Sequence, residues 1–296
     1  MSGKIDTLAL ERWVWECNRF QPEQFDLFVV EGQVVGAVAR SLRDRLAAHP
    51  EVFAFDGRRV TLNPELETSQ ARTEAVERVL EQWYAQGVFT GWRGERDDVS
   101  TGFGAPPCLS IERSAAPLFG VQVYGVHING FVRRPDGIDL WVAQRSAHKP
   151  EYPGRLDHLV AGGLASGMSA YETVVKECAE EAAVPESLAR SVRPAGLVSY
   201  RRSGDGWSSR VVLFVYDLEL PGDFVPRNTD GEVDEFYLWP VERVIETVSR
   251  TRKFKTNCNL VIIDFLVRHG YLCPEDRHYI EIVCGLRPDL FDSCSQ

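Results

Sequence analysis

The sequence lacks the marks of several protein classes. Its seven cysteines are scattered and never spaced CxxC, which argues against a disulfide framework or a zinc site and is typical of a reducing compartment. No apolar run has the length of a signal peptide or a membrane span. Lysine and arginine number 33 against 43 acidic residues, and the formal charge of −10 argues against a general nucleic-acid binder. We therefore expect a cytoplasmic protein that binds neither membranes nor nucleic acids.

The sequence does contain enough apolar residues, 44% of 296, for one large domain or two modest ones. Turn signals at Glu31-Gly32 and Asp56-Gly57 indicate two hairpins, and apolar periodicity predicts a helix over Ser69–Ala85. A polar stretch then follows that is the best candidate for a linker or long loop, TGWRGERDDVSTGFGAPP. We expect a small α+β N-terminal domain at 1–116 and a second domain at 117–296.

The second part is typical of a mixed sheet with helices. Strand-like stretches on either side of Pro135-Asp136-Gly137 indicate a hairpin, and further strands are expected at Val211–Leu218 and Glu235–Trp239. Pro240 is expected at the first position of a helix, and Gly270 is expected to end a buried one. This order predicts an α+β fold rather than an all-β or all-α domain.

The most informative stretch is a glycine-rich run followed by an acidic helix, GGLASGMSAYETVVKECAEEAAVP, residues 162–185. Ser169 with Glu172 forms a capping box, so the helix should begin at Ser169. Three further acids fall at i, i+3 and i+4 and cluster on one face: Glu177, Glu180 and Glu181. Clustered carboxylates repel one another unless they are solvated or share a cation, so this face is either a solvated surface or a Mg²⁺ site.

The order of these acids resembles the Nudix box of diphosphate hydrolases, G-x5-E-x7-R-E-U-x-E-E-x-G-U, where U is a bulky aliphatic residue. Counted from Gly162, the three glutamates occupy the three metal-site positions of the box. Three other positions differ, because Met168 replaces the first Glu, Lys176 replaces Arg and Ala183 replaces the final Gly. We expect the capping box and an ion pair between Glu172 and Lys176 to supply the missing support.

The flanking sequences resemble the Nudix branch related to thiamine pyrophosphokinase, in which an N-terminal domain precedes the Nudix domain. They are RSAHKPEYPGRLDHLVAGG, ERSAAPLFGVQVYGVHINGF and DLELPGDFVPRNTDGEVDEFYLWP. The resemblance spans most of the chain and implies a Nudix α/β/α sandwich with a mixed sheet after a smaller α+β domain. Type I isopentenyl diphosphate isomerases share the RSxxK…PG…D run and supply an alternative.

The resemblance implies a Mg²⁺-dependent hydrolase, with Mn²⁺ as an alternative metal. Its substrate would be a small organic diphosphate, namely thiamine diphosphate or oxidised analogues, cleaved to the monophosphate and phosphate. Three alternatives stay open: a nucleotide-sugar or dinucleotide pyrophosphatase, an isomerase-like enzyme and a non-catalytic diphosphate-binding module. The oligomeric state is also open, a homodimer included.

The resemblance also assigns roles to residues. The expected metal ligands are Glu177, Glu180 and Glu181. Catalysis is expected from Glu180 and Glu181, and from Glu232 in the acidic turn NTDGEVDEF as a base or extra ligand. The cations expected to hold phosphate, in order of preference, are Arg145, Lys149, Arg155 and Arg210, with Lys255 weaker still. Gly162 and Gly163 would let the backbone approach the phosphate, whereas His127 and His158 are expected to be packed side chains.

Overall fold

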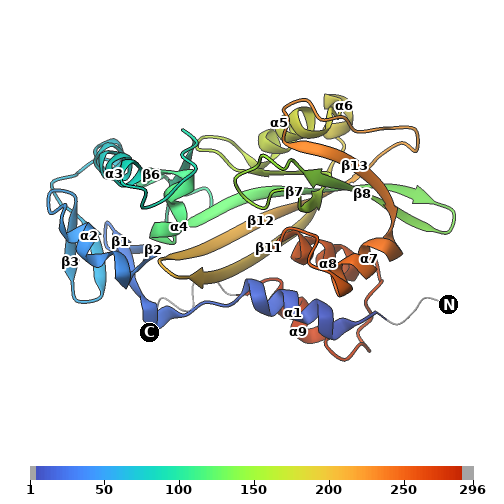
Figure 1. Cartoon of the computed structure of the whole chain (residues 1–296), viewed down its shortest axis with the longest axis horizontal. Helices are drawn as coiled ribbons and strands as arrows, with labels where there is room; N and C mark the ends of the chain where they lie inside the picture. Colours follow the sequence, from blue (N-terminus) through green and yellow to red (C-terminus); the bar gives the residue numbers. More distant parts are fainter. Residues whose placement is uncertain (1–4, 289–296) are drawn as a thin grey trace.

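Glycine turns and one long helix organise residues 22–119, which we call the first part of the chain (Figure 1). The residues from 120 onward are called the second part. In this computed structural model, which describes residues 5–288, Gly32 and Gly57 have positive φ and join antiparallel strands, as predicted. The sheet has the order β2-β1-β4-β3, in which β1 and β4 are parallel, and α3 shares its core. The elements of this part are η1 (Pro22–Gln24), β1 (Phe25–Val30), β2 (Gln33–Ala39), η2 (Arg40–Leu42), α2 (Arg43–Ala47), β3 (Phe53–Asp56), β4 (Arg59–Leu62) and α3 (Ser69–Ala85).

The stretch expected to be a linker is in part a strand. β5 (Arg96–Val99) lies within it and pairs antiparallel with β6 (Leu109–Glu112). The sequence RDDV lacks the apolar alternation that would predict a strand, because an inward-facing residue is a carboxylate. This residue, Asp97, is buried and paired with Arg113. η3 (Arg113–Ala115) and α4 (Ala116–Phe119) then lead to the second part.

Seven strands form the larger sheet. Its main path is β11-β12-β7-β8-β13, while β10 pairs with β7 and β9 pairs with β8. β12 and β7 are parallel and the other pairs are antiparallel, so the sheet is mixed, as predicted. The strands are β7 (Gln122–Arg134), β8 (Gly137–Arg145), β9 (Leu156–His158), β10 (Val160–Gly163), β11 (Arg193–Gly204), β12 (Trp207–Glu219) and β13 (Val233–Pro240).

Helices cover both faces of this sheet, which confirms the predicted α/β/α sandwich (Figure 1). One face packs against α5 (Ala170–Ala182) and α6 (Glu186–Ala189). The other face packs against α7 (Val241–Arg250), α8 (Cys258–Arg268) and α9 (Tyr279–Gly285). Pro240 is the N-cap of α7 rather than its first residue, and Gly270 has positive φ just after α8. No helix within residues 5–288 has the length and apolarity needed to cross a membrane.

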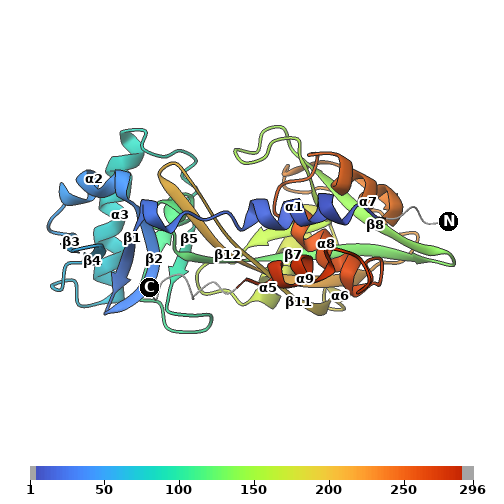
Figure 2. The same ribbon diagram turned by 90° about the horizontal axis from the view of Figure 1, so that it is seen from below.

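The first helix of the chain belongs to the core of the second part, which the sequence did not predict. α1 (Thr7–Cys17) lies beside α8 and α9 in both views (Figures 1 and 2). Its residues Leu10, Trp13 and Val14 are buried in the core formed by the sheet and the C-terminal helices. The indole N–H of Trp13 donates a 2.8 Å hydrogen bond to the carbonyl oxygen of Val248 on α7. Residues 7–17 therefore lie on the second part, and the chain then crosses to the first part and returns.

Candidate active site

The acidic helix α5 begins as its capping box predicts. The hydroxyl of Ser169 accepts a hydrogen bond from the N–H of Glu172 (3.2 Å), and the Glu172 carboxylate accepts one from the N–H of Ser169 (2.9 Å). The backbone and hydroxyl of Ser169 thereby lower the pKa of Glu172. Val174 and Cys178 are buried against the sheet. This packing holds the glutamate face of the helix along a cavity.

The cavity has a volume of about 880 Å³ and is lined by both parts of the chain. The second part contributes the predicted metal-site glutamates and several basic residues, and the first part contributes a charged edge near β5 and η3. Acidic residues in its lining include Glu95, Asp97, Glu177, Glu180, Glu181 and Glu232. Basic residues in its lining include Arg93, Arg113, Arg145, Lys149, Arg202 and Lys255.

Glu181 is a buried carboxylate at this cavity. One of its oxygens accepts a 2.9 Å hydrogen bond from the N–H of Ala161 on β10, and no cationic side chain within residues 5–288 pairs with it. Burial raises the pKa of Glu181 well above its usual range, and burial also raises that of Glu177. For both carboxylates the loss of solvation outweighs the hydrogen bond or ion pair that each one makes.

Lys176 pairs with the acidic face and not with Glu172, which corrects the predicted ion pair. Its ammonium lies 2.6 Å from Glu180 Oε2 and 3.4 Å from Glu177 Oε1. The capping box occupies the carboxylate of Glu172. Lys176 is free to lie between the two other glutamates and offset their repulsion.

The glycines of β10 leave room for neighbouring side chains. A Cβ atom on Gly162 would lie 2.4 Å from Cδ of Glu177, so a larger residue there would displace that carboxylate. A Cβ atom on Gly163 would lie 3.0 Å from a guanidinium nitrogen of Arg113. Both glycines line the cavity, and both permit a close approach to the strand.

The four preferred candidates for phosphate-binding cations separate into two pairs, and Lys255, the fifth candidate, lines the cavity. Arg145 lines the cavity, where it donates to Asp157 (3.0 Å) and to the carbonyl oxygen of Glu151 (2.9 Å). Lys149 also lines it and is paired with Glu232. The other two do not line the cavity: exposed Arg155 donates to the carbonyl of Arg252, and Arg210 is buried on β12.

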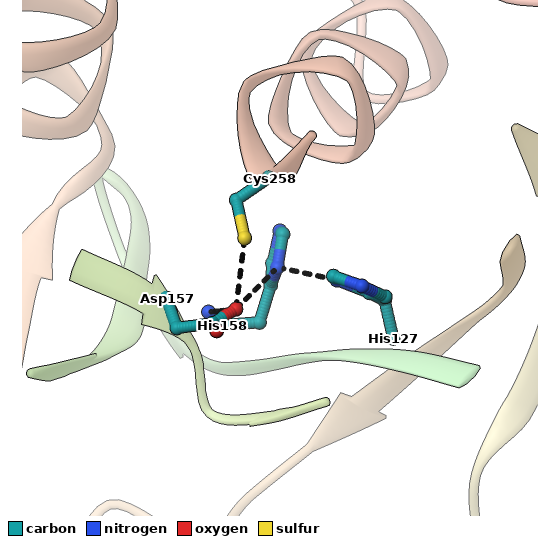
Figure 3. Close-up of side chains that lie close together, drawn as sticks. All are labelled: His127, Asp157, His158 and Cys258. Carbon is teal, nitrogen blue, oxygen red and sulfur yellow. Dashed lines mark hydrogen bonds and ion pairs between the residues drawn. The ribbon is translucent and has the colours of Figure 1, made fainter. Parts of the chain in front are cut away.

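Four buried side chains from three elements lie beside this cavity (Figure 3). His127 comes from β7, Asp157 and His158 come from β9, and Cys258 is the first residue of α8. Their potential ligand atoms all lie within 4.8 Å of one another. Figure 3 shows the thiol of Cys258 directed at Asp157 and the two imidazole rings directed at each other.

The distances within this cluster are those of hydrogen bonds. The two Nδ1 atoms lie 2.9 Å apart and the Cys258 thiol donates to Asp157 over 2.8 Å, whereas ligands of a tetrahedral zinc are roughly 3.3–3.8 Å apart. A metal-bound histidine also donates its second ring N–H, but Nε2 of His158 is buried and has no hydrogen-bond partner in the described structure. Although burial opposes it, Lys255 and His158 hold the pKa of Asp157 well below its usual range. We interpret the cluster as a network that holds Lys255 beside the cavity.

Comparison with known proteins identifies the family. The NUDIX domain matches residues 123–258, and the domain of unknown function DUF4743 matches residues 9–123. Nudix hydrolase 24, chloroplastic, from Arabidopsis thaliana is 46% identical over 275 residues, which cover 92% of this chain and 75% of that protein. The chain belongs to the Nudix hydrolase family.

A second curated relative agrees with this assignment, and a solved structure is also similar. Nudix hydrolase 20, chloroplastic, from the same plant is 44% identical over 283 residues, covering 92% of this chain and 75% of that protein. The crystal structure of DR0079 from Deinococcus radiodurans is 25% identical, with a TM-score of 0.43, and covers 60% of this chain and 100% of that one. As a Nudix hydrolase the protein acts on phosphoanhydride bonds and uses a divalent metal. The domain division expected at 116/117 stays a prediction.

The residues of this Nudix hydrolase fit a divalent metal at α5. Glu181 is buried with spare acceptor capacity, and Glu177 is half-buried beside it at the same cavity. Carboxylate oxygens are the ligands that Mg²⁺ and Mn²⁺ prefer. Sequence reasoning alone did not select Arg202 or the first-part residues Glu95, Asp97 and Arg113, because nothing local in the sequence connects them with α5.

The altered end of the box keeps the backbone shape that a glycine would give. Ala183 adopts a left-handed conformation with φ 52° and ψ 32° at the end of α5. The N–H of Val184 then bonds to the carbonyl oxygen of Cys178 over 2.9 Å. A left-handed alanine costs about 1 kcal/mol relative to glycine, so this hydrolase tolerates a strained cap where the family pattern has none.

Proposed function

We propose that this Nudix hydrolase cleaves a small organic diphosphate to the monophosphate and phosphate, with Mg²⁺ as its metal and Mn²⁺ as a substitute. One observation supports the proposal above the others. A single cavity is lined both by the glutamates of α5 and by the ammonium groups of Lys149 and Lys255. A diphosphate needs both kinds of group, because its charge is neutralised by a metal and by basic side chains together.

In the proposed reaction the oxygen of a water molecule bonds to the terminal phosphorus. The bond from that phosphorus to the bridging oxygen breaks, and the bridging oxygen leaves with the monophosphate. A divalent metal bound to the glutamates supplies charge neutralisation and lowers the pKa of the attacking water. We assign Glu177 and Glu181 as principal ligands and Glu180 as a ligand or bridging residue. Glu232 accepts the proton of the water, and Lys149 holds the phosphate.

The organic half of the substrate is proposed from the flanking sequences and the cavity. The flanks resemble the branch related to thiamine pyrophosphokinase, so we propose thiamine diphosphate or its oxidised analogues. The cavity of about 880 Å³ lies within the range of small-molecule sites.

The test is phosphate release from a substrate panel with and without Mg²⁺. The panel contains thiamine diphosphate, its oxidised analogues, a nucleotide sugar, a dinucleotide and isopentenyl diphosphate. We expect Mg²⁺-dependent phosphate release from the thiamine compounds, and we expect Glu181→Gln to abolish it. The matched control is Glu186→Gln, which makes the same change at an exposed residue of α6 and should keep full activity.

Other outcomes would select a different function. Two monophosphates from the dinucleotide, with no free phosphate, would indicate a pyrophosphatase. An isomerised isoprenoid diphosphate without phosphate release would indicate an isomerase. Tight diphosphate binding without any Mg²⁺-dependent phosphate release would indicate a non-catalytic binding module and refute the proposal.

The proposal includes a small-molecule partner and excludes nucleic acid, on the strength of the formal charge of −10. Two Arabidopsis relatives are named as chloroplastic, and a cytoplasmic location for this chain stays a prediction. Fluorescent tagging would test the location, and size-exclusion chromatography would distinguish a monomer from a homodimer.

A further inference from the structure

The loop that joins the glycines of β10 to the acidic helix is hydrogen-bonded to the first part of the chain. Residues 164–169 form this loop, which we call the box loop. The N–H of Ser166 donates to the carbonyl oxygen of Arg96 over 3.0 Å. The hydroxyl of Ser166 donates to the carboxylate of Asp98 over 2.6 Å. Both acceptors lie on β5, so the loop is bonded to that strand by backbone and side chain.

A second contact lies at the other end of the same segment. The guanidinium of Arg113 lies against Gly163, within 3.4 Å of where a Cβ atom would be. Asp97 fixes the guanidinium through a 2.9 Å bond to Nε, and Glu95 pairs with Nη1. Only 15% of the Arg113 side chain is exposed. Because the Arg113 side chain is enclosed and ion-paired, it forms a fixed packing surface for Gly163, the last residue of β10.

These contacts lead back into the core of the first part. Asp98 also accepts a 2.8 Å hydrogen bond from the hydroxyl of Ser110 on β6. The N–H of Ser110 in turn donates a 2.8 Å hydrogen bond to the hydroxyl oxygen of Thr73 on α3. The box loop is therefore connected through β5 and β6 to a helix that is buried against the first sheet.

Within the second part the box loop is held mainly at its two ends. The N–H of Leu164 donates to the Tyr124 carbonyl (2.9 Å) at one end, and the capping box holds Ser169 at the other. Between them, the N–H of Met168 bonds only within the loop, to the Ala165 carbonyl (3.1 Å). Met168 has no charged group with which to hold the loop, although the box pattern has a glutamate at this position. The hydrogen bonds to β5 lie two residues before Met168 and can replace that support.

We propose that the first part, which lies within the match to the domain of unknown function, is a positioning element of the hydrolase site. Asp98 and Arg113 hold the box loop, and the loop sets the place of Gly163 and the start of α5. The glutamates of α5 thereby keep the spacing that a divalent metal requires. This inference rests on the proposed function, since it takes the glutamates to be the metal site.

The experiment measures Mn²⁺ binding directly, by electron paramagnetic resonance of the full chain without substrate. Ser166→Ala and Asp98→Ala should each weaken binding about tenfold, the lower end of what the loss of an outer-shell partner costs. The double variant should be no weaker than either single variant, because both remove the same hydrogen bond. Asp98→Asn keeps an acceptor oxygen and should restore binding to within about threefold of the wild type.

The matched control is Ser110→Ala, which removes the other hydroxyl bond of Asp98 but leaves the box loop bonded. It should alter thermal stability without altering Mn²⁺ binding. Hydrogen exchange should accelerate at residues 164–168 in Ser166→Ala and stay unchanged in the control. These readouts separate positioning from a general loss of fold.

The outcomes distinguish this inference from the proposed function. A wild-type chain that fails to bind Mn²⁺, or a Glu181→Gln variant that binds it normally, would overturn the proposed metal site and this inference with it. Normal Mn²⁺ binding and exchange in Ser166→Ala and Asp98→Ala, with Glu181→Gln deficient, would overturn the positioning role alone.

Discussion

Gly162→Ala should inactivate the enzyme without unfolding it. The added Cβ atom would lie 2.4 Å from Cδ and 2.5 Å from Cγ of Glu177. Ordinary contact between carbon atoms is about 3.5–4.0 Å, so the Glu177 side chain must move by roughly 1 Å or more. A displacement of about 1 Å at a catalytic group can cost about 100-fold in rate. We therefore expect at least a 100-fold loss of Mg²⁺-dependent phosphate release.

Stability should change little, because the obstructed atoms are the far end of a flexible side chain. Gly162 lies in extended backbone, and Gly→Ala at a compatible site stabilises by about 0.4–1 kcal/mol through the unfolded chain. The control is Gly137→Ala, whose Cβ atom would meet nothing within 4 Å. The assays are phosphate release and thermal unfolding. Activity of the folded Gly162→Ala variant within threefold of the wild type would refute this reasoning.

Three further changes test the fold. Ala183→Gly should remove about 1 kcal/mol of left-handed strain and raise the melting temperature by about 2 °C, and an unchanged temperature would contradict that strain. Against the effect of burial, His269 and Arg268 lower the pKa of Asp217 to about 2. Its stabilisation is therefore full above about pH 4 and is lost as the pH falls through about 2. Asp217→Asn should lower the free energy of unfolding, measured in urea, by about 2 kcal/mol at pH 7 and by almost nothing near pH 2. An equal difference between variant and wild type at both pH values would contradict this. Trp13→Ala should cost about 3–5 kcal/mol in one cooperative transition, whereas a loss below 1 kcal/mol would show that α1 is not part of the core.

Local chemistry made the acidic helix predictable from the sequence. A serine three residues before a glutamate specifies where α5 begins, and spacings of three and four residues determine which acids share a face. Hairpins could be predicted for the same reason, since Gly32 and Gly57 supply the positive φ that their turns need. The error at Lys176 was also local: the carboxylate of Glu172 had two partners available, and the capping box took it.

The parts of the site that the sequence did not predict depend on contacts between distant segments of the chain. Lys255 lies beside the cavity because Asp157, 98 residues earlier, faces it from β9. Arg113 reaches Gly163 only because β5 and the box loop are adjacent in space. Neither contact produces a periodic pattern or a motif in the sequence, so neither can be predicted from short segments of a single sequence.

The packing of α1 also has a consequence for synthesis on the ribosome. This helix is made before the other described elements, and the helices that bury Leu10, Trp13 and Val14 begin only at residue 241. At about 5–20 residues per second, roughly 10–50 s pass before those partners exist. During that interval the first sheet can fold, while an apolar helix remains uncovered ahead of it. The nascent chain therefore presents a binding segment to chaperones until residues 241–285 have been made.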